Sequence, residues 1–141
     1  MNFLKLNHHW THFDLLYFRE TNQKYINKLL NKPNGVDFVF KQLEISKKVI
    51  YDANPKILII SNTMARHFMG FEKNQENTLG VWMGFDFEFD QKLGTYRIVN
   101  DLKLNNTPVF FTSMLSGQRA LDNGSFERLI WHLNFVLNLL N

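Results

Sequence analysis

Lys56-Ile-Leu-Ile-Ile-Ser61 is a short apolar run, rich in β-branched residues, that lies between a proline and a polar turn. Runs of this kind are typical of a strand covered on both faces of its sheet. A strand buried in this way needs helices on both sides of the sheet. The run therefore predicts a layered α/β fold.

Helices are predicted on both sides of this run in the sequence. Residues 36–53 carry an apolar face, for which the spacing selects Val36, Phe40, Leu43 and Ile50. Pro55 ends that helix, and Asn62 or Thr63 can cap another through about Met69. Residues 36–70 thus predict helix, buried strand and helix in succession.

The rest of the chain extends this pattern with several elements. We expect a helix after Thr21, a strand that alternates apolar and polar residues and buries Phe85, Phe87 and Phe89, its hairpin partner at residues 95–99, a strand at residues 107–112, and a last helix with Ser125 as its N-cap. Together they predict one domain, residues 1–141, with helix, sheet and helix layers. The central sheet is expected to be mostly parallel, with an added β-hairpin.

Composition narrows the classes of function. The chain has no cysteine, which excludes disulfides, thiolate metal sites and cysteine nucleophiles. It has neither a signal peptide nor a membrane span, so we expect a cytoplasmic protein without membrane contact. The formal net charge of +3 is compatible with a polyanionic partner, but also with a source genome biased toward Asn and Lys codons.

Common catalytic and metal motifs are missing. His8, His9 and His12 have no carboxylate or cysteine that completes a metal site, so we expect no metal and no cofactor. A triad of Ser113 or Ser116 with His132 lacks the nucleophile-elbow sequence.

The polar loop of residues 113–124 is a candidate ligand site. It follows a buried strand and leads into a helix, where open α/β sheets usually bind their ligands. Ser116, Gln118 and Arg119, together with helix N-terminal amides, are suited to hold a phosphate. An ordinary strand-to-helix connection fits the same spacing equally well.

Three segments resemble the uracil-DNA glycosylase superfamily, closest to its single-strand-selective monofunctional members. Residues 7–23 resemble the uracil-recognition segment, with Asn7 at the position of the base-reading asparagine. Residues 56–66 resemble the strand and turn after the family's central helix. Residues 108–117 resemble the strand that enters the loop carrying His-Pro-Ser in that family, although Met114 and Leu115 replace the first two of these residues.

The resemblance implies a protein that binds DNA, single-stranded or duplex, and a flipped uracil. Asn7 would then read the base, Trp10 or Phe13 would stack on it, and the residue 113–124 loop would contact the DNA. Hydrolysis of the N-glycosidic bond is the implied reaction of base excision repair. The early loop that positions the hydrolytic water has no counterpart, so Asp14 and Glu20 are the candidate bases.

Two other functions compete with this hypothesis. The missing histidine favours a nucleic-acid-binding or protein-interaction domain without chemistry, and Asp14, Glu20 and the histidines allow a different hydrolase. Because the resemblance covers about the last two-thirds of a family domain, the fold is expected to lack the first strands. An exposed sheet edge left by that loss would favour a homodimer.

Overall fold

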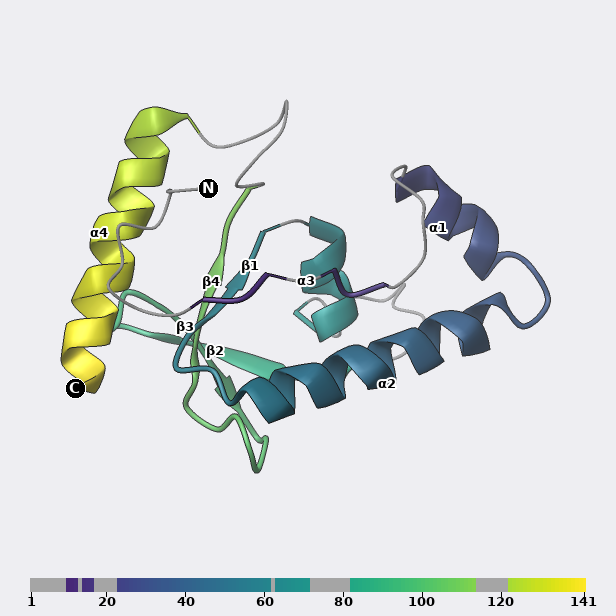
Figure 1. Cartoon of the computed structure of the whole chain (residues 1–141), viewed down its shortest axis with the longest axis horizontal. Helices are drawn as coiled ribbons and strands as arrows, with labels where there is room; N and C mark the ends of the chain where they lie inside the picture. Colours follow the sequence, from purple (N-terminus) through teal and green to yellow (C-terminus); the bar gives the residue numbers. More distant parts are fainter. Residues whose placement is uncertain (1–9, 13, 17–22, 62, 72–81, 114–121) are drawn as a thin grey trace.

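The computed structural model describes residues 10–12, 14–16, 23–61, 63–71, 82–113 and 122–141 (Figure 1). The elements within these ranges are α1 (Gln23–Leu30), α2 (Gly35–Ala53), β1 (Leu58–Ile60), α3 (Thr63–Met69), β2 (Asp86–Asp90), β3 (Thr95–Val99), β4 (Pro108–Phe111) and α4 (Asn123–Leu140). The α/β class is therefore confirmed, as are the strand after α2 and the hairpin of β2 and β3. Of the β1 residues only Ile60 is fully buried, since β1 is an edge strand of the described sheet.

The sheet of the described chain is mixed, with the strand order β1-β4-β3-β2. β1 pairs with β4 in parallel, with Leu58 opposite Val109 and Ile60 opposite Phe111. The pairs β2–β3 and β3–β4 are antiparallel. The prediction of a mostly parallel sheet is thus wrong for these strands. The reason is that the hairpin joins β4 through β3 instead of lying apart from the central sheet.

Side chains of β1 and β4 alternate between two hydrophobic clusters. Leu58, Ile60 and Val109 face the cluster that includes α2 and α3, while Ile59 and Phe110 face α4. This alternation follows from the two-residue period of a strand. The helices consequently cover both faces of the sheet, with α4 on one side and α2 and α3 on the other, as Figure 1 shows. The predicted helix, sheet and helix layers are confirmed.

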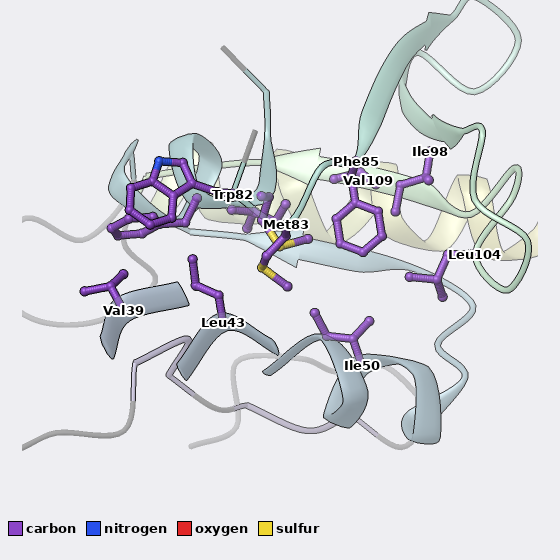
Figure 2. Packing of buried hydrophobic residues seen from close by; sticks show 12 residues of the cluster. Val39, Leu43, Ile50, Trp82, Met83, Phe85, Ile98, Leu104 and Val109 are labelled. Carbon is purple, nitrogen blue, oxygen red and sulfur yellow. The ribbon is translucent and has the colours of Figure 1, made fainter. Parts of the chain in front are cut away.

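The inner face of α2 carries the larger cluster. Its buried residues are Gly35, Val39, Leu43, Ser46 and Ile50. Figure 2 shows Val39, Leu43 and Ile50 directed toward Met83, Phe85 and Val109. Val36 and Phe40, which the spacing assigned to this face, are exposed. The helix is rotated relative to the prediction, because neighbouring apolar residues at positions 36, 38, 39 and 40 allow more than one apolar face.

The two long helices have different terminal contacts. α2 ends at Asn54, whose left-handed backbone lets its N–H donate to the carbonyl oxygens of Ile50 and Tyr51. At the start of α4, Asp122 accepts a hydrogen bond from the Ser125 N–H, so Asp122 is the N-cap and the prediction of Ser125 is wrong.

None of the helices in the described ranges combines the length and the apolar character needed to cross a bilayer.

We expect Leu43→Ala to destabilise the fold strongly, because Leu43 is only 2% exposed and its truncation leaves a cavity between α2 and the sheet. The free energy of unfolding should fall by about 2 to 5 kcal/mol in urea denaturation. Ile45→Ala is the matched control, since Ile45 is exposed on the same helix. Equal losses in both variants would contradict the observed orientation of α2.

Candidate functional site

The carboxyl ends of β1 and β4 lie at one edge of the sheet because these strands run parallel. The Thr112 N–H, just after β4, donates to the Ile60 carbonyl oxygen at 2.9 Å. β3 is antiparallel to β4, so the turn from β2 to β3 comes to the same edge. Ligands of α/β proteins commonly bind outside this edge. The candidate loop after β4 begins here at Ser113, but residues 114–121 lie outside the described chain.

Five aromatic rings, here termed the aromatic cluster, gather near this edge on the α3 side of the sheet. They are Phe71, Phe87, Phe89, Tyr96 and Phe111. Phe111 has centroid distances of 4.4 Å to Phe71, 5.2 Å to Phe87 and 5.3 Å to Tyr96. Phe89 contacts Tyr96 edge to face at 5.4 Å. The cluster therefore joins β2, β3 and β4 to the residue that follows the turn after α3.

The aromatic cluster is open to solvent in part. Phe89 is 52% exposed, whereas the other four rings are half-buried. Phe85, two residues before Phe87, is 1% exposed and belongs to the core. The expectation that Phe89 shares a buried face with Phe85 and Phe87 is thus wrong. β2 is an edge strand of the described sheet, and the cover that buries Phe85 does not extend along β2 as far as Phe89.

Arg66 of α3 lies against this cluster. Its guanidinium carbon is 5.9 Å from the ring centroids of both Phe71 and Phe111. Its Nε is buried and has no hydrogen-bond partner among the described residues. Because this Nε is shielded from solvent, a ligand would contact the rest of the half-buried Arg66 side chain, beside the partly open aromatic surface.

The turn after α3 fixes the relation between Arg66 and Phe71. The N–H groups of Gly70 and Phe71 both donate to the Arg66 carbonyl oxygen. Gly70 has a φ of +113°, and a Cβ there would lie 2.8 Å from the Phe85 carbonyl oxygen. Only glycine fits this turn without strain, because L side chains rarely adopt that φ. The cluster thus depends on the backbone as well as on its rings.

A second group of polar side chains lies where α2 faces the β3–β4 connection. The Tyr51 hydroxyl donates to Asp101 Oδ2 at 2.6 Å, and Asp101 Oδ1 accepts from the N–H groups of Lys103 and Leu104. The ammonium groups of Lys47 and Lys103 lie 5.7 and 5.0 Å from the Tyr51 ring centroid. Lys47 also donates to the Met83 carbonyl oxygen at 3.0 Å.

The pKa values of this group argue for a structural role. Burial, with the hydrogen bond to Asp101, raises the pKa of Tyr51 well above its ordinary value. Burial alone would raise the pKa of Asp101, but the hydrogen bonds from Tyr51, Leu104 and Lys103 and the charge of Lys47 lower it overall. Tyr51 therefore stays protonated, and Asp101 stays ionised with its oxygens engaged. The hydrogen bonds that hold both groups fit a structural role.

The structure places few of the site residues predicted from the sequence. Trp10, His12 and Asp14 are exposed. Asn7, Phe13, Glu20, Ser116, Gln118 and Arg119 lie outside the described residues, so their roles stay predictions. In the described ranges, no three His, Asp or Glu side chains come close enough to hold a metal ion.

Two further expectations were a triad that includes His132 and a phosphate site at the N-terminal amides of the last helix. In both places the structure shows other contacts. His132 Nε2 lies 2.7 Å from the Leu93 carbonyl oxygen, and its ring packs against Phe110 at 4.8 Å. Asp122 occupies the N-terminus of α4, and the hydrogen bonds from Ser125 lower the pKa of its carboxyl group. A phosphate at the first turn of α4 would therefore meet a carboxylate, which disfavours the proposed use of these amides.

No family model matches this chain, and no curated protein or solved structure matches it significantly. The resemblance to uracil-DNA glycosylases therefore stays a prediction. Evidence on function comes from the geometry of the chain itself.

Sequence reasoning missed Arg66 and the aromatic cluster as a site. The alternating Phe87 and Phe89 were interpreted as core residues because alternation alone does not reveal how far a covering helix extends. Two features of the sequence, taken together, could have indicated the site. Aromatic residues lie in three segments that begin or end near one edge of the sheet, and the helix after the first strand carries an arginine.

Acid should weaken the link between α2 and the β3–β4 connection. The folded state lowers the pKa of Asp101, so its contribution to stability is present above the unfolded pKa of about 4 and is lost as the pH falls through the folded value. We expect Tyr51→Phe to lower the free energy of unfolding at pH 7 by about 1 to 3 kcal/mol. Between pH 7 and pH 3 this variant should lose less stability than the unchanged protein.

Urea denaturation over this pH range measures the effect. Tyr96→Phe is the control, because it removes a tyrosine hydroxyl group on β3 that is not a hydrogen-bond partner of Asp101. An acid dependence that Tyr51→Phe leaves unaltered would contradict the role given to the Tyr51–Asp101 hydrogen bond.

Proposed function

We propose that this chain is a nucleic-acid-binding domain. Nucleobases stack on its aromatic cluster, and Arg66 binds oxygen atoms of the bases or phosphates of the nucleic-acid backbone. DNA is the partner that the resemblance implies. The observation that carries the proposal is the half-buried Arg66 guanidinium, 5.9 Å from two rings of a partly exposed aromatic cluster at the carboxyl ends of two parallel strands.

The chemistry of such a surface suits single-stranded nucleic acid. Bases stack on exposed aromatic side chains for about 1 to 3 kcal/mol each, and arginine adds cation–π and charge interactions. Phe89 and Tyr96, in edge-to-face contact at 5.4 Å, offer the open part of the surface. A duplex would need to be opened before its bases reached the rings, so the proposal favours single strands.

The uracil-DNA glycosylase hypothesis extends this proposal to one base and one reaction. Asn7 would read the edge of a flipped uracil, while Ser116, Gln118 and Arg119 would contact the DNA backbone. The position of Ser113 after β4 supports the second part, because the loop that follows starts at the same sheet edge as the aromatic cluster. Hydrolysis of the N-glycosidic bond, with Asp14 or Glu20 as the base, is the further step. Binding without hydrolysis is the alternative.

Binding is tested by fluorescence anisotropy with single-stranded DNA that carries one uracil, and with an otherwise identical strand that carries thymine. Phe89→Ala should raise the dissociation constant about 5-fold to 150-fold, the equivalent of one lost stacking contact. Arg66→Gln should weaken binding most at low salt, because it removes a charge that competes with counterions.

Phe40→Ala is the matched control, since Phe40 is an exposed phenylalanine on α2 outside the cluster. It should bind like the unchanged protein. Affinities unaffected by both Phe89→Ala and Arg66→Gln would overturn the proposal. Alkali treatment of the bound strands separates its two forms: breakage of the uracil strand alone indicates a glycosylase, and intact strands indicate a binding domain.

A further inference from the structure

The outer face of α4 carries an apolar stripe, defined here as Trp131, Phe135 and Leu139. These side chains are 69%, 40% and 52% exposed. Their spacing of four residues places them in one row along the helix. The rings of Trp131 and Phe135 are stacked, with centroids 5.6 Å apart and planes within 8°. The stripe is therefore a continuous preformed surface.

The opposite side of α4 is already committed to the core. Leu133 and Val136 are buried against Phe110 of the sheet, with Leu129 packed beside them. A rotation of the helix that hid the stripe would expose these residues instead. Intramolecular packing on this side is therefore satisfied, and water contacts the stripe unless another molecule covers it.

The area of the stripe fits a small dimer. With roughly 200 Å² for each large side chain, the three exposed fractions amount to about 300 Å² of apolar surface. Small stable interfaces bury about 600 Å² on each partner, of which slightly more than half is apolar. The stripe therefore supplies about the apolar area that one partner of such a dimer contributes.

Charge favours a second copy in the antiparallel orientation. The last turn of α4 has no basic side chain to offset its carbonyl groups. In an antiparallel pair centred between Trp131 and Phe135, Arg128 of each copy lies beside Asn138 in the last turns of the other helix. A two-fold axis makes both contacts at once, as an isologous interface requires.

The β2 edge of the described sheet is a poorer place for self-association. β2, the last strand of the described sheet, carries Asp86, Glu88 and Asp90. Arg97 pairs with Glu88 and Asp90, but an antiparallel pair of two such edges would still bring acidic side chains of both copies together, which protects edges against pairing. These charges direct self-association away from β2.

We propose that α4 forms a homodimer interface, with the stripe of one copy packed antiparallel against the stripe of a second copy. Trp131 of each copy then stacks on Phe135 of the other. The interface lies on the opposite side of the sheet from the aromatic cluster, so it leaves that cluster accessible in both copies.

Sedimentation velocity over about 1 to 200 μM tests the interface. We expect dimers of the unchanged protein within this range, and a dissociation constant at least about 30-fold higher for Trp131→Ala, as for a central aromatic contact. Ile45→Ala, which truncates an exposed apolar residue on α2, should leave the constant unchanged. A monomer throughout the range, or equal effects of both variants, would overturn the proposal. Circular dichroism checks that both variants are folded.

The orientation has a test of its own, because the chain contains no cysteine. Arg128→Cys and Asn138→Cys are prepared separately, mixed and oxidised. The antiparallel pair predicts that disulfides between the two variants exceed those within either one. A predominance of disulfides between two Arg128→Cys chains would overturn the antiparallel arrangement.

Discussion

The parallel pairing of β1 with β4 is the constraint on which the other features depend. Because β4 lies inside the sheet, Val109 and Phe110 point to opposite faces and each needs its own helical cover. Burying both faces with α2 and α3 on one side and α4 on the other removes apolar surface from water, the main driving force for folding. The same pairing leaves two strand ends and the β2–β3 turn at one edge, where the aromatic cluster forms.

The aromatic cluster combines stability with exposure. Most of its ring pairs pack edge to face, a favourable geometry for aromatic pairs, yet Phe89 remains open and the buried Nε of Arg66 has no partner among the described residues. A purely structural cluster would be expected to pair that buried group. The Tyr51–Asp101 pair is the contrast within the same chain, because both of its partners are hydrogen-bonded. This difference is the physical reason for assigning binding to one group and support to the other.

Elements with a clear period were predictable from the sequence. The apolar run of β1 and the alternation of β2 identified strands, and apolar residues at helical spacing after Ser125 identified α4. The prediction of which α2 residues are buried was wrong at Val36 and Phe40. Several neighbouring residues there are apolar, and the helical period does not say which of the possible apolar faces is buried. The parallel prediction failed because strand order is set by tertiary contacts. Among the proposed site residues, Arg66 escaped prediction because its significance lies in rings from distant strands.

The central claim is that nucleobases bind at the aromatic cluster. Its most direct test is aromatic NMR of the protein labelled with carbon-13 in its Phe, Tyr and Trp rings, titrated with single-stranded DNA that contains uracil. The account predicts that the ring signals of Phe89 and Tyr96 shift with increasing DNA, while those of Trp131 and Phe135 on the opposite face stay in place. Shifts confined to Trp131 and Phe135, or no shift in any of these four rings, would contradict the account.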